Sequence, residues 1–86
     1  MARFLTMHRT IVPQSDRKRY VERMRAKRDY YARANCRFYV FEEAQLKGAF
    51  LEFFEADDLE TLAAAHASAP ESLVDPARIY REVELK

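Results

Sequence analysis

The sequence predicts one α+β domain over residues 1–86, in which two helices cover one face of a four-stranded antiparallel sheet. Apolar residues recur with period two in four segments and with helical period in two others. The order of these segments is strand, helix, strand, strand, helix, strand. A chain of 86 residues is also short enough to build one hydrophobic core. Its strands are apolar on both faces, so we expect the sheet to need a cover on each side.

The first strand is expected at residues 3–12, where β-forming residues alternate with polar ones up to Pro13. Ser15 or Asp16 can cap the helix that follows, which we expect to run for about 18 residues. One stripe of this helix is apolar, and its members stand at helical spacing: Tyr20, Val21, Met24, Lys27 or Arg28, and Tyr31. Asn35 is the expected C-terminal stop.

Residues 36–42 and 49–55 are expected to pair as an antiparallel hairpin around a turn at residues 43–48. That turn contains Gly48, the single glycine of the chain. Asp57 or Asp58 opens the second helix, and Asp57 has capping-box spacing to Glu60.

The second helix is expected to bury one face and to end at Pro70, and that face holds Leu59, Leu62, Ala63 and His66. A loop at residues 71–77 and a final alternating strand at residues 79–85 complete the chain. This βαββαβ order is the ferredoxin-like arrangement.

One face of such a sheet stays bare in a monomer. In the third strand, Phe50 and Phe54 point to one face, whereas Leu51 and Phe53 point to the other. Large apolar side chains left in water would form a sticky patch. We therefore expect a second copy of the same face to cover it, which gives a homodimer through the open sheet face.

A pattern over residues 48–68 joins the third strand to the second helix. It has an inner glutamate, Glu52, an aromatic residue two positions later, an acidic helix start, and His66 before a small-residue loop. In this pattern, and in element order over nearly the whole chain, the sequence resembles the dimeric α/β-barrel superfamily, in particular its antibiotic-biosynthesis-monooxygenase-like branch.

That resemblance implies two sheets closed face to face, and a monooxygenase-like or isomerase-like reaction on a small apolar or aromatic molecule without a cofactor. A non-catalytic ligand-binding or interaction dimer is the alternative. The haem-degrading relatives carry an Asn, a Trp and a His where this chain has His8, Phe54 and His66. Two of the three differ, so haem degradation is not implied.

Three side chains are candidates for acid–base catalysis: His8, Glu52 and His66. The alternatives are a solvated strand histidine for His8, a partly buried helix-end histidine for His66, and an intersubunit ion pair for Glu52. A small ligand would be held by polar and aromatic side chains of the same sheet face, namely Thr6, Thr10, Phe38, Phe50 and Phe54.

Other site classes find little support. The two histidines and Cys36 have no metal-ligand spacing, and there is no glycine-rich phosphate loop. A lone cysteine fits a reducing compartment, so we expect a cytoplasmic protein with Cys36 as a small buried hydrophobe. The N-terminus is too polar for a signal peptide, and no apolar run is long enough for a membrane span.

Charge is divided unevenly along the chain, with 11 Lys/Arg and 3 Asp/Glu in residues 1–37 against 4 and 11 in residues 38–86. Such asymmetry can mark a nucleic-acid surface, and residues 47–53 resemble the third-strand signature of the RNA-recognition motif. However, the basic residues fall on the first helix, away from the sheet aromatics, and Glu52 would repel phosphate. The sequence therefore argues against RNA binding.

Overall fold

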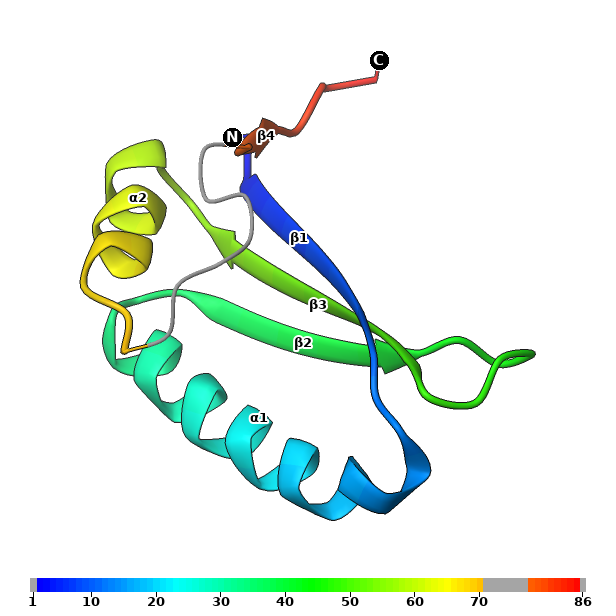
Figure 1. Cartoon of the computed structure of the whole chain (residues 1–86). Helices are drawn as coiled ribbons and strands as arrows, with labels where there is room; N and C mark the ends of the chain where they lie inside the picture. The colour runs from blue at the N-terminus through cyan, green and yellow to red at the C-terminus, as the bar shows by residue number, and fades with distance from the viewer. Residues whose placement is uncertain (1, 71–77, 86) are drawn as a thin grey trace.

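The computed structural model describes residues 2–70 and 78–85. Its elements follow the order β1 (Phe4–Ile11), a 3₁₀ turn (Gln14–Asp16), α1 (Arg17–Arg33), β2 (Arg37–Glu42), β3 (Ala49–Ala56), α2 (Leu59–Ala67) and β4 (Tyr80–Arg81). The strands form one sheet of order β2-β3-β1-β4, with every neighbouring pair antiparallel. Both helices lie on the same side of the sheet (Figure 1). The predicted ferredoxin-like α+β fold is thus confirmed.

The start of α1 is fastened to the β2–β3 hairpin by one carboxylate. Arg17 donates to both oxygens of Glu42 at 2.7 and 2.9 Å, and the Gly48 amide donates to the same carboxylate at 2.9 Å. These bonds lower the pKa of Glu42 to about 2. Gly48 has φ +91°, and a Cβ there would meet the Val12 carbonyl oxygen at 2.7 Å, so this turn requires glycine.

The ends of the helices follow the sequence in part. Asp16 is the N-cap of α1 but makes no capping hydrogen bond, because the 3₁₀ turn already leads into the helix. Asn35 has φ 63° just after α1, which confirms the expected stop. At α2 the cap is Asp58, whose Oδ1 accepts from the Thr61 amide at 2.7 Å, whereas Asp57 pairs with Arg37.

Two predicted features are wrong in detail. The last strand ends at Arg81, which lies opposite Phe4, the first residue of its partner β1. Beyond this pair, the Glu82 amide still donates to the Arg3 carbonyl oxygen at 2.8 Å, but no strand continues there. In α2, Leu62 and Ala65 are buried, while Leu59 and Ala63 are exposed, so the helix is rotated from the expected face. The predicted loop at residues 71–77 lies outside the described residues.

The core lies between the helices and the sheet. Tyr31, Phe54 and Leu62 are its largest fully buried apolar side chains. A neighbouring cluster consists of Tyr20, Met24 and Phe50. Cys36 belongs to the core as a buried free thiol, as the sequence predicts.

Neither α1 nor α2, the helices of the described ranges, has a stretch long and apolar enough to cross a membrane.

Candidate functional site

Strand register places the predicted site residues on one face. In the β1–β3 pair, Thr6 lies opposite Phe54, His8 opposite Glu52, and Thr10 opposite Phe50. Phe54 is also the partner of Phe38 on β2. This is the face that the helices cover, and His66 reaches it from α2. The structure therefore brings all eight predicted site residues into one layer.

Glu52 is buried at 2 % exposure, and both of its oxygens are occupied. Tyr20 donates its hydroxyl to Oε2 at 2.9 Å, and Lys27 donates to Oε1 at 3.1 Å. The ion-pair partner of Glu52 is therefore within the chain and not in another subunit. Burial and the adjacent carboxylate raise the pKa of Tyr20, so its hydroxyl stays protonated and keeps donating.

His66 connects α2 to both α1 and β1. Its Nδ1 lies 2.8 Å from the Tyr31 hydroxyl, and its Nε2 lies 2.9 Å from Oγ1 of Thr6. Burial lowers the pKa of His66 and raises that of Tyr31. A neutral imidazole has one donor and one acceptor nitrogen, and two hydroxyl partners satisfy either tautomer. The Tyr31–His66–Thr6 chain is thus complete within the molecule.

His8 differs from the other two candidates. It is half-buried on β1, and its side chain makes no hydrogen bond or ion pair with the rest of residues 2–70 and 78–85. Of the three predicted acid–base groups, it alone has polar atoms left for a ligand.

The aromatic residues predicted to hold a ligand pack mainly against each other. Phe54 is fully buried, with its ring centroid 4.9 Å from Tyr31, 5.0 Å from Phe38 and 5.2 Å from His66. Phe50 lies 4.6 Å from Tyr20. Thr6 is also buried, and its hydroxyl is hydrogen-bonded to His66. These side chains fill the space between helices and sheet.

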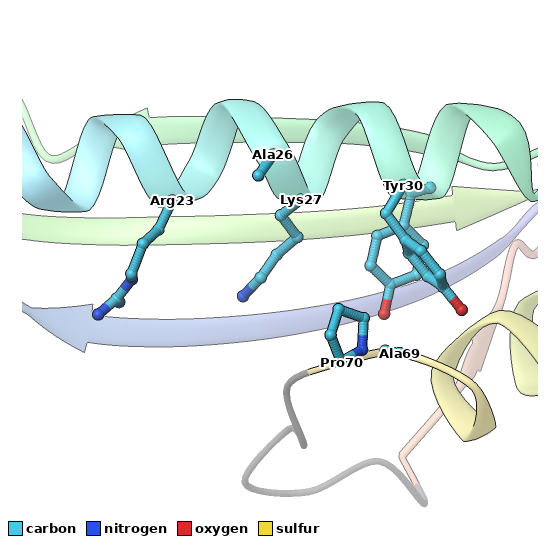
Figure 2. A pocket seen from close by; sticks show the side chains of 7 residues that line it. Arg23, Ala26, Lys27, Tyr30, Ala69 and Pro70 are labelled. Carbon is cyan, nitrogen blue, oxygen red and sulfur yellow. The ribbon is translucent and has the colours of Figure 1, made fainter.

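Hollows lie along one flank of α1. One is a cavity of about 120 Å³ lined by residues of α1 and of the chain just after α2: Arg23, Ala26, Lys27, Tyr30, Tyr31, Ala69 and Pro70. Figure 2 shows this cavity from close by. A second hollow of about 200 Å³ lies between α1 and the end of β1, and its lining includes Thr10, Arg19, Tyr20 and Arg23. Arg23 borders both.

The sequence prediction missed Tyr20, Lys27 and Tyr31 as the polar partners of the covered face. One signal was present, because Lys27 falls within the apolar stripe of its helix and Glu52 within an apolar strand. A single charge on each of two packed apolar surfaces favours a buried pair.

The other face of the sheet is open and largely apolar, and its members come from β1, β2 and β3: Leu5, Met7, Ile11, Tyr39, Phe41, Leu51 and Phe53. Glu55 lies at one end with 7 % exposure. It accepts from Arg37 at 2.6 Å, Arg3 at 2.9 Å and the Tyr39 hydroxyl at 3.3 Å. At the opposite end, Arg9 pairs with Glu43 at 3.3 Å.

Comparison with known proteins gave no match to a protein-family model, to a curated protein or to a solved structure. The function is therefore argued from geometry. Within the described ranges, no group of three or more His, Cys, Asp or Glu side chains is placed to hold a metal ion.

Proposed function

We propose that this protein is a homodimeric binding module of the dimeric α/β-barrel type, in which two copies pack their open sheet faces together. The observation that carries the proposal is the apolar character of that face. Phe41 is 60 % exposed, and Met7, Ile11 and Tyr39 are also exposed. Each large apolar side chain contributes about 1.5–3 kcal/mol when it is fully buried. A cover for this face would stabilise the protein substantially.

The charges of the open face support a second copy as the cover. Glu55 and Glu43 are each paired with arginine on the same face, so among the described residues of β1, β2 and β3 and their ends this face has no unpaired carboxylate to attract a charged partner. What it offers is an apolar centre with neutralised ends. A twofold axis places such a surface against itself without bringing like charges into unpaired contact.

The non-catalytic role is supported by the contacts of two of the three candidate catalysts, Glu52 and His66. A general acid or base must reach a substrate atom within hydrogen-bond distance. Glu52 and His66 each direct both polar atoms to side chains of their own chain. They hold the helices on the sheet, and a ligand would have to displace those bonds to react.

The dimer is tested by light scattering on the purified protein. We expect about twice the chain mass of 10.2 kDa. Met7→Glu should shift the mass to that of a single chain, because it places a charge in the middle of the interface. Leu46→Glu is the matched control, since Leu46 is also 47 % exposed but lies in the β2–β3 turn. A monomeric parent protein at micromolar concentration, or a dimeric Met7→Glu variant, would disprove the proposal.

His8 supports a second candidate function, the cofactor-independent monooxygenase-like or isomerase-like chemistry of the antibiotic-biosynthesis-monooxygenase-like branch. Its imidazole lies opposite Glu52 in the β1–β3 register and has no partner among the described side chains. An imidazole whose ring nitrogens are free of side-chain partners can act as a general acid or base on a bound substrate. Oxygen uptake with 1,4-dihydroxynaphthalene as substrate tests this. Catalysed uptake that His8→Asn abolishes would support it, whereas uptake at the uncatalysed rate would reject it.

A further inference from the structure

We propose that the hollow between α1 and the end of β1 binds a small anionic molecule through its carboxylate or phosphate group. This hollow, here called the α1–β1 groove, is lined by Thr10, Ile11, Val12, Pro13, Asp16, Arg19, Tyr20 and Arg23 and has a volume of about 200 Å³. It lies on the helix side of the sheet. The proposal therefore does not depend on dimerisation through the open face.

Two cations stand on the helix wall of the groove. Arg19 and Arg23 are one turn apart on α1, so their guanidinium groups project in similar directions. Neither has an ion-pair partner within residues 2–70 and 78–85. Asp16 is the single carboxylate in the lining and leaves an excess of positive charge. An anion placed between the two arginines would relieve their mutual repulsion.

The other cations of α1 show why the groove stands out. Arg17 is paired with Glu42, Arg25 with Glu22, Lys27 with Glu52, and Arg28 with Asp29. A third hollow, between α1 and β2, is lined by Arg25 and Arg28, which are both paired, and Lys18 and Arg33 line none of the three hollows beside the helix. The unpaired positive charge of α1 that faces a concavity is therefore that of Arg19 and Arg23.

Arg23 makes a ring contact that favours its orientation toward the groove. Its guanidinium carbon lies 5.8 Å from the Tyr20 ring centroid, and Tyr20 is itself fixed by Phe50 and Glu52. Figure 2 shows Arg23 and Lys27 extending from α1 on the same side. A pre-ordered guanidinium loses less entropy when it binds, and its planar fork matches carboxylate and phosphate oxygens.

The opposite wall suits a small molecule with an apolar body. Thr10 supplies a hydroxyl from β1, and Val12 and Pro13 supply apolar surface. A polyanion such as RNA would instead need cations spread along a surface, and half of the cations of α1 are already paired with carboxylates. The concave shape and the convergence of two arginines favour a compact anion.

Calorimetric titration with three probes tests the site. Phenyl phosphate carries a phosphate group on a phenyl ring, and benzoate carries a carboxylate on the same kind of ring. Benzyl alcohol is the neutral counterpart of both. We expect saturable binding of at least one anion and none of benzyl alcohol. Tighter binding of phenyl phosphate would assign a phosphate ligand, and tighter binding of benzoate would assign a carboxylate.

We expect Arg19→Met and Arg23→Met each to raise the dissociation constant of the anion about ten-fold or more, since each removes a charge-assisted hydrogen-bond donor. Arg25→Met is the control on the same helix and should bind as the parent does. All three arginines are exposed, so thermal unfolding of the variants should match the parent. No saturable binding of either anion, or equal weakening by Arg25→Met, would overturn the proposal. So would RNA binding that Arg25→Met reduces as much as Arg23→Met.

Discussion

Glu52 and Glu55 lie three residues apart on β3, on opposite faces of the sheet, and both are nearly buried at 2 % and 7 % exposure. Their donors differ in origin. Glu52 is held by Tyr20 and Lys27 of α1, from far along the chain, whereas Glu55 is held by side chains of the sheet's own layer. Polar groups on the covered face thus depend on helix docking. Those on the open face are satisfied by the sheet alone.

The two ion pairs also differ in their contact with water. The Lys27 side chain is 13 % exposed, whereas the arginines that bind Glu55 are 57 % and 40 % exposed. Water and salt screen exposed pairs, so they contribute little to stability, while the loss of one partner from a buried pair is costly. The covered face should therefore determine the free energy of unfolding, and the open face the state of association.

The largest expected effect separates two adjacent phenylalanines. Phe54→Ala should lower the free energy of unfolding by about 3–5 kcal/mol, because it leaves a cavity beside Tyr31 and His66. Phe53→Ala, on the open face, should cost less in the monomer and act mainly on association. Urea denaturation at two protein concentrations measures both. If both variants lost the same free energy of unfolding, and the loss did not change with protein concentration, the two faces would not differ in the way proposed.

An intermediate effect comes from the ion pairs. Lys27→Met should cost about 3 kcal/mol, since it leaves the Glu52 carboxylate buried with Tyr20 as its remaining donor. Arg37→Met removes a partner of Glu55 but should cost no more than about 1 kcal/mol, because Arg37 is exposed to water and Arg3 remains. Chemical denaturation of both variants checks the order, and a larger loss for Arg37→Met would contradict it.

The smallest expected effect is a pH dependence confined to the covered face. Burial lowers the pKa of His66 below its ordinary value of 6.5. The unfolded chain then takes up a proton before the folded one does. Stability from this group is therefore complete above about pH 6.5 and is lost as the pH falls through the folded-state pKa. Thermal unfolding midpoints between pH 8 and 5 should decline less in His66→Asn than in the parent, and parallel curves would exclude His66 as the cause.

Local features of the fold could be predicted from single residues. Asn35 and Gly48 have the positive φ angles that their residue types favour, and the strand–helix order follows from periodicity. The end of β4 could not be predicted, because alternation at residues 79–85 does not show where the partner strand β1 begins. Pairing partners far apart in the chain determine it.

The candidate site was predictable as a set of residues but not as a geometry. Alternation correctly grouped Thr6, His8 and Thr10 on one face. Since both faces are apolar, it could not say which of them the helices cover. The bonds of Glu52 and His66 arise from side chains 25 to 60 positions away, which no local pattern specifies. Because these bonds occupy the polar atoms of Glu52 and His66, we propose a binding role for the protein and not a catalytic one.

The carboxylate of Glu42 has a consequence for the exchange of amide hydrogens with solvent. Gly48 lies in a hairpin turn, where amides ordinarily exchange quickly, yet its N–H donates to Glu42 and the residue is buried. With a pKa of about 2, Glu42 keeps its charge, and therefore this bond, far into the acid range. A turn amide of this protein should consequently behave like one in the middle of a strand, and its exchange would report when the first turn of α1 detaches from the hairpin.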